Sequence, residues 1–193
     1  MSPIDPSRHG PPVVERSGAE EALRVSEERL RLATRGAGIG IFDYDAVADR
    51  CLQSPEAYAL LGVAGGTRPR LADFIAIIHR DDRARVAAAI AAALDPQGAG
   101  MLDEEFRILH VDTAETRWVK QASQTYFEGS GSEKRAVRVT GALIDITERK
   151  IREARDQFLL TLNDALRSET NPLAIQKTAT RLLGEHLQAN RVV

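Results

Sequence analysis

Residues 103–111 read DEEFRILHV, residues 117–127 read RWVKQASQTYF, and residues 135–146 read RAVRVTGALIDI. In each stretch apolar and polar side chains alternate, and a period of two is typical of β-strands. The segments between them are short and polar, as in the connections that join neighbouring antiparallel strands. The three stretches therefore predict three consecutive strands linked by two hairpins.

The preceding part of the chain predicts two shorter strands, at 39–44 and 50–53, followed by three helices. Ser54 and Pro55 suit the N-cap and the first position of a helix that ends at Gly62. Apolar residues at helical spacing predict a second helix over 71–78 and a longer third helix that ends at Leu94.

This order of elements predicts an α+β fold. We expect a five-stranded antiparallel sheet in which the first two strands pair beside the last three, with helices covering one face. The domain should span residues 36–147.

Both flanks of this domain predict helices. Residues 1–17 are rich in proline and are expected to form a disordered tail, followed by a helix over 18–35 and an exit helix over 148–168. Apolar side chains recur along one side of each helix at the spacing of a parallel helix pair, namely Leu23, Leu30, Ala33, Ile151, Ala154, Phe158 and Leu162. These stripes predict a homodimer formed through the flanking helices. The shorter stripe over 18–35 fits a helix packed on a domain edge, or a solvated linker, almost as well.

Six local motifs, in this order, resemble those of PAS domains from bacterial sensor kinases. They are GIFDYD (40–45), SPEAYALLG (54–62), HRDD (79–82), EFRI (105–108), RWV (117–119) and GALIDITERK (141–150). Arg80 departs from the proline that is usual in the third motif, and the hairpin at 112–116 lacks the common Asp-Gly turn.

The resemblance implies a non-catalytic sensory module that binds a small molecule between its sheet and its helices. Phe42, Tyr58, Phe106 and Trp118 are the candidates for the wall of that cavity. The same aromatic side chains could equally fill a closed core.

The resemblance also implies that signals leave through Asp145, Ile146 and Thr147, where the last strand becomes the exit helix. We expect Thr147 to cap this helix and Asp145 to pair with a nearby basic group. Capping alone would be the simplest role for both residues.

The identity of any cofactor is unknown from the sequence. Light-sensing PAS relatives carry their reactive cysteine in a stretch that corresponds to 65–70, whereas Cys51 lies on a predicted strand, so flavin is disfavoured. Haem is disfavoured because His79 lies at a helix start, and neither His110 nor His186 has a partner at metal-ligand spacing. We find no metal site and no catalytic motif, and predict no enzyme activity for this stretch.

Residues 169–193 resemble the first helices of a GAF domain, a domain that often follows PAS in sensor histidine kinases. We therefore expect that the chain is cut from a longer protein, and that this parent is a histidine kinase. The alternatives are a dimerisation scaffold that senses nothing and the input module of a cyclic-dinucleotide enzyme.

Composition fits a cytoplasmic location. The chain has 26 basic and 28 acidic residues and a net charge of −2, without the basic patch of a nucleic-acid-binding protein. The single cysteine allows no internal disulfide, and no apolar run reaches the roughly 20 residues of a membrane helix.

Overall fold

The computed structural model describes residues 13–167 and 171–189. The elements in chain order are α1 (Val13–Gly36), β1 (Ile39–Asp45), β2 (Arg50–Gln53), α2 (Pro55–Leu61), α3 (Leu71–Ile77), α4 (Arg80–Leu94), β3 (Met101–Leu109), β4 (Thr116–Glu128), the short 3-10 helix η1 (Gly131–Glu133), β5 (Arg135–Asp145), α5 (Thr147–Arg167) and α6 (Pro172–Ala189).

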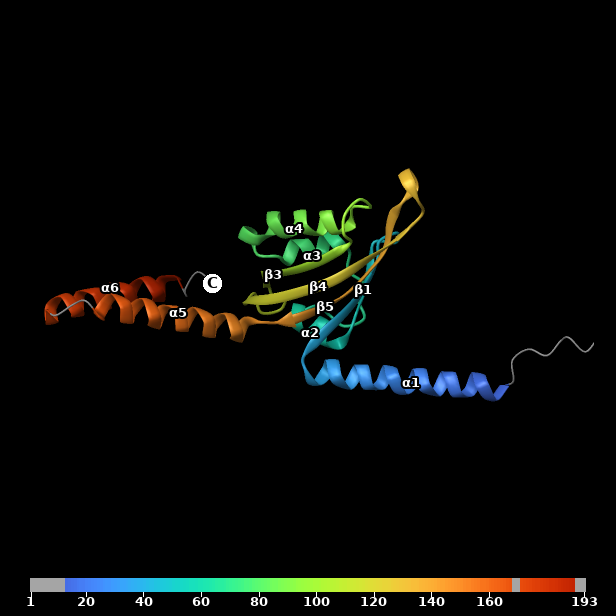
Figure 1. Cartoon of the computed structure of the whole chain (residues 1–193), viewed down its shortest axis with the longest axis horizontal. Helices are drawn as coiled ribbons and strands as arrows, with labels where there is room; N and C mark the ends of the chain where they lie inside the picture. The colour runs from blue at the N-terminus through green and yellow to red at the C-terminus, as the bar shows by residue number, and fades with distance from the viewer. Residues whose placement is uncertain (1–12, 168–170, 190–193) are drawn as a thin grey trace, which may run out of the picture.

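The five strands form one sheet in the order β2-β1-β5-β4-β3, and all neighbours are antiparallel. The predicted fold is therefore confirmed, including the pairing of the first two strands beside the last three. The β1–β5 pairing joins two strands that are far apart in the chain. The sheet is therefore complete only when both ends of the domain are present (Figure 1).

Local capping explains where α2 begins and ends. The Ser54 hydroxyl accepts hydrogen bonds from the backbone N–H groups of Ala57 and Ile41, and so fixes both the helix start and the adjacent strand. Gly62 has a φ of 70°, a left-handed conformation that glycine adopts without strain, and it ends the helix.

The hydrophobic core lies between one face of the sheet and the helices α3 and α4, which lie over the sheet in Figure 1. Its fully buried members include Ile78, Val86, Phe106, Ile108 and Val119. The α4 helix is capped by His79, whose Nδ1 accepts the backbone N–H of Asp81.

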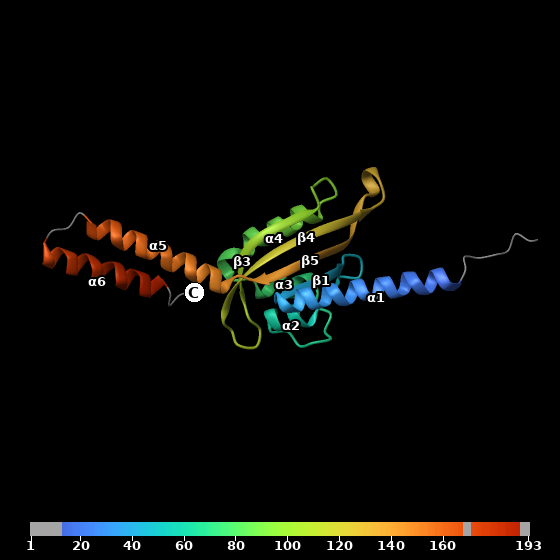
Figure 2. The ribbon, with the colours of Figure 1, turned by 60° about the horizontal axis from the view of Figure 1, so that its bottom comes forward.

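The flanking helices extend away from the domain. The α1 helix runs beyond one end of the sheet, while α5 and α6 form an antiparallel pair that leaves the other end (Figures 1 and 2). The α1 helix begins at Val13, directly after the last proline of the predicted tail, so the prediction of a tail through residue 17 was wrong for its last five residues.

Other predictions lie partly beyond the described residues. The rest of the predicted tail falls outside them, and so do residues 169–170 and 190–193 of the GAF-like segment. Within the described residues, no helix is both long enough and apolar enough to span a membrane.

Candidate functional site

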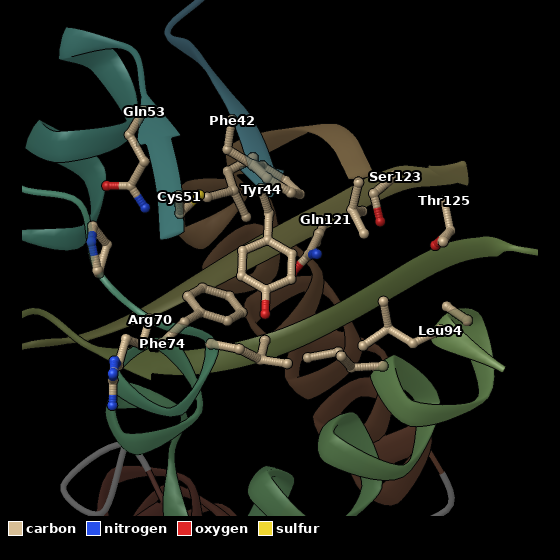
Figure 3. A pocket seen from close by; sticks show the side chains of 16 residues that line it. Phe42, Tyr44, Cys51, Gln53, Arg70, Phe74, Leu94, Gln121, Ser123 and Thr125 are labelled. Atoms are coloured by element: carbon tan, nitrogen blue, oxygen red, sulfur yellow. The ribbon is translucent and has the colours of Figure 1, made fainter. Parts of the chain in front are cut away.

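A cavity of about 60 Å³ lies between the sheet and the helices α3 and α4 (Figure 3). Its lining residues come from four strands, two helices and the loop before α3: Phe42, Tyr44, Cys51, Gln53, Pro69, Arg70, Leu71, Phe74, Ile90, Ala93, Leu94, Gln121, Ser123, Thr125, Val139 and Leu143. A single water needs only about 10–15 Å³, so the cavity has room for a few waters or one very small molecule.

Two amide side chains give the largely apolar wall its polarity. Among the described residues, Gln53 Oε1 and Gln121 Oε1 are buried without a hydrogen-bond partner. Gln121 is 6% exposed and projects from β4 in the middle of the wall (Figure 3). Buried polar groups in proteins are nearly always paired, so these two oxygens require a partner in the cavity, either water or a small molecule.

Tyr44 and Asp49 connect the wall to the start of α3. The Tyr44 hydroxyl donates a 3.0 Å hydrogen bond to Asp49 Oδ1, which also accepts the backbone N–H of Leu71. Burial, followed by the hydrogen bond to Asp49, raises the pKa of Tyr44 to about 12. The phenol therefore stays neutral throughout the physiological range.

Cys51 lies in the wall as a half-buried thiol. Burial raises its pKa to about 11, although a hydrogen bond from the backbone of Asp43 acts in the opposite direction. The thiol is therefore protonated at neutral pH, which fits the predicted role of a small apolar side chain.

Only one of the four predicted wall residues lines the cavity, and that residue is Phe42. Phe106 lies deeper in the core, where its ring packs edge-on against Phe74 at 6.2 Å. The strand register pairs Phe106 with Val119 and Arg107 with Trp118, so Phe106 and Trp118 lie on opposite faces of the sheet.

Tyr58 also lies away from the cavity wall. It points along α2 toward the following loop, where its hydroxyl donates a 2.5 Å hydrogen bond to the carbonyl of Thr67. The wall prediction was therefore wrong for Tyr58, Phe106 and Trp118.

The predicted signal exit is a compact joint between β4, β5 and α5. Asp145 Oδ1 accepts the backbone N–H of Thr147 at 2.8 Å, so Asp145 caps the exit helix. The Thr147 hydroxyl accepts the backbone N–H of Trp118 at 3.0 Å. Ile146, which is 8% exposed, donates its own N–H to the Trp118 carbonyl. The expected roles of Asp145 and Thr147 are therefore corrected: the carboxylate caps the helix, and the hydroxyl binds the neighbouring strand.

A charged cluster surrounds Trp118 on the outer face of the sheet. Lys150 Nζ and the guanidinium carbon of Arg107 lie 5.1 and 5.5 Å from its ring centroid. Glu105 pairs with Lys150 at 2.8 Å and with Arg149 at 2.7 Å. Hydrogen bonds from Lys150, and secondarily from Arg149, lower the pKa of Glu105.

The same cluster reaches the start of α4. Arg107 donates hydrogen bonds of 3.0 Å from Nε and Nη2 to the two carboxylate oxygens of Asp82, and its backbone N–H also binds Asp82 Oδ2. The side-chain hydrogen bond from Arg107 is the main reason that the pKa of Asp82 is lowered. The α4 helix is thus linked through Arg107 and Trp118 to the exit helix.

The cavity residues Gln121, Ser123 and Thr125 were not predicted. They occupy alternate positions of β4 and therefore share one face. These polar residues follow buried Val119 at every second position of β4, and this alternation is the signal that could have identified them.

A five-stranded antiparallel sheet with helices across one face and a cavity between the two layers defines a class of small α+β domains. The model of the family described as "PAS fold" matches residues 52–140. A sensory box histidine kinase/response regulator from Burkholderia thailandensis has a solved structure of the same fold, with a TM-score of 0.56 and 27% identity over 72% of this chain and 98% of that one. The domain built from β1–β5 and α2–α4 therefore has the PAS fold.

Two further proteins are similar to this chain, one in structure and one in sequence. The N-terminal domain of a diguanylate cyclase with PAS/PAC sensor from Marinobacter aquaeolei has the same fold, with a TM-score of 0.50 and 18% identity over 58% of this chain and 98% of that one. The non-motile and phage-resistance protein of Caulobacter vibrioides is 33% identical over 160 residues, which is 82% of this chain. The chain spans 18% of that relative's length.

Proposed function

We propose that the chain is the sensory input module of a cytoplasmic bacterial signal-transduction protein, and that the parent protein is a histidine kinase. A small molecule in the cavity shifts α4 relative to the sheet. The shift passes through the joint around Trp118 and changes the position of the exit helix α5.

The observation that carries this proposal is the continuous contact from the cavity to α5. Ile90, Ala93 and Leu94, in the second half of α4, line the cavity, while Asp82 at its start binds Arg107. Arg107 and Lys150 both contact the Trp118 ring. Because a helix moves as a rigid element, displacement at one end of α4 acts on the ion pair at its other end.

The kinase assignment rests on similarity. The Burkholderia thailandensis protein is described as a histidine kinase, and residues 169–193 resemble the start of a GAF domain. The GAF assignment stays a prediction from sequence. An output that makes a cyclic dinucleotide has only the fold of the Marinobacter aquaeolei domain in its favour.

Dimerisation is the second part of the proposal. Leu23 and Leu30 on α1 and Ile151 on α5 are each at least 60% exposed, although they belong to the apolar stripes. Covering such a stripe with a second copy would remove apolar surface from water. A strict monomer by light scattering at high protein concentration would contradict this part.

The small volume of the cavity favours the competing function, a scaffold that senses nothing. Native mass spectrometry and an absorption spectrum of protein purified from its own host separate the two functions. A bound mass or a chromophore band supports sensing and identifies the ligand. A clean apo mass would contradict it and favour the scaffold.

A further inference from the structure

Within the part of the chain that the structure describes, two buried amide oxygens at the cavity lack a hydrogen-bond partner, and the first belongs to Gln121. Gln121 is 6% exposed, its side chain lines the cavity, and its Oε1 has no partner. A carboxamide offers an acceptor and two donors side by side, so its natural complement is a group that also combines a donor with an acceptor.

A second amide lies in the same wall. Gln53 comes from the edge strand β2, and its Oε1 is also buried without a partner among the described residues. Ser123 and Thr125 add two hydroxyl groups on the β4 side (Figure 3). The polar groups therefore lie on the sheet side of the cavity, while the side formed by α4 is lined by Ile90, Ala93 and Leu94.

The charged side chain in the cavity lining is paired with a partner outside the cavity. Arg70 is the only charged lining residue, and its Nε lies 3.7 Å from Asp49 Oδ2 at the exposed surface. An anion inside would therefore find no free cation from the lining, and a cation would find no carboxylate. Burying an unpaired charge is strongly unfavourable, so the site selects neutral molecules.

We infer that this cavity binds a very small, neutral, flat molecule that carries a hydrogen-bond donor next to an acceptor, held by the Gln121 carboxamide. This inference rests on the proposed sensory function and names the chemical class of its ligand. The apolar residues of α4 cover the other face of the molecule, so binding also fixes the position of this helix.

Pyrazole is a suitable probe, because it is a small neutral ring with an N–H beside an acceptor nitrogen. The experiment titrates it into the ¹⁵N-labelled chain and follows amide shifts by NMR, in parallel with furan, 1-methylpyrazole and acetate. We expect pyrazole to shift the amides of residues 121–125 and 90–94. It should bind about tenfold more tightly than furan or 1-methylpyrazole, which lack the donor. Acetate should cause no shift there.

Gln121→Leu should remove the preference for pyrazole over furan, while Gln97→Leu, the same change on an exposed loop, should keep it. The comparison of pyrazole with 1-methylpyrazole in the unmodified chain needs no variant, so a folding defect in Gln121→Leu does not remove the test. Equal affinities of all neutral probes, tighter binding of acetate, or no shift with any probe would overturn the inference.

If the ligand inference holds but the proposed sensory function fails, the NMR titration should give a different result. In that case pyrazole would bind with the expected preference, but the indole N–H signal of Trp118 and the amides of 147–151 would not move. That result would leave a ligand site without a relay.

Discussion

Lys150 Nζ lies 5.1 Å from the ring centroid of Trp118, and this contact joins the first turn of the exit helix to strand β4. Arg107 approaches the same ring at 5.5 Å, so two cations from different elements share one aromatic side chain. Trp118 is the chain's single tryptophan, and its fluorescence therefore reports directly on this joint.

Lys150→Ala should loosen the joint without unfolding the domain. The change removes the contact with Trp118 and the ion pair with Glu105, both partly exposed, so the free energy of unfolding should fall by no more than about 1 kcal/mol. Hydrogen exchange of the backbone amides in the first turns of α5 should rise clearly. Arg152→Ala is the matched control, because among the described residues Arg152 pairs only with exposed Glu148 on the same helix. Equal exchange in the two variants would show that the Trp118 contact does not hold α5.

Asp82→Asn should reveal a stabilising ion pair that depends on pH. Arg107 lowers the pKa of Asp82 in the folded state. A carboxyl with a lowered pKa stabilises the fold above its unfolded-state pKa, near 4, and this contribution disappears as the pH falls through the lower folded-state value. Asp82→Asn should therefore cost about 2 kcal/mol at pH 7, and less as the pH drops below 4.

Urea unfolding at a series of pH values measures this difference. Asp81→Asn is the control. Asp81 also lies near Arg107, at 3.6 Å, but its side chain is 57% exposed, so this ion pair should contribute little to stability. A cost for Asp82→Asn that stays constant down to pH 2 would contradict the assignment.

Gly40→Ala should destabilise the domain strongly for a change of one methyl group. An added Cβ would lie 2.7 Å from the Cα of Ala57, a fully buried residue on α2, so strand and helix would have to separate. We expect a loss of about 1–3 kcal/mol in thermal or urea unfolding. Gly65→Ala meets no atom within 4 Å and should be neutral or slightly stabilising. Equal stability of the two variants would mean that β1 and α2 are not packed this closely.

Cys51 should react very slowly with iodoacetamide in the native protein. Its pKa of about 11 leaves roughly a hundredth of the thiolate that an ordinary cysteine has at pH 8. Mass spectrometry after timed alkylation should show native protein labelled at least about 100-fold more slowly than protein in urea. Similar rates in the two conditions would place the thiol in solvent and not in the cavity wall.

Most of the fold could be predicted from the sequence because its signals are local. Alternation marked β3, β4 and β5, and Ser54 and Gly62 marked the ends of α2. The transition from β5 to α5 was located for the same reason, although the hydrogen bonds of Asp145 and Thr147 depend on where the backbone of Trp118 lies.

The cavity could not be predicted in the same way. Alternation shows that Trp118 and Val119 face opposite sides, but it does not show which side the helices cover. The large aromatic Trp118 suggested the inner face, yet two cations and the exit helix cover it on the outer one. The gap lined by Gln121 exists because α3 and α4 pack over the sheet without filling the space above β4, and this arrangement depends on contacts between distant segments.

The proposed relay requires that the state of the cavity reaches the exit helix. Ala93→Leu tests it without a known ligand, because Ala93 is 7% exposed on α4 and lines the cavity, so a larger apolar side chain fills the space. Ala88→Leu makes the same change on the exposed side of α4 and serves as the control.

The deciding measurement is hydrogen exchange of residues 147–151 in both variants, with Trp118 emission recorded in parallel. Filling the cavity in Ala93→Leu should change the exchange of this segment and shift the emission, while Ala88→Leu should match the unmodified chain. A folded Ala93→Leu variant with unchanged exchange and unchanged emission would contradict the relay from the cavity to α5.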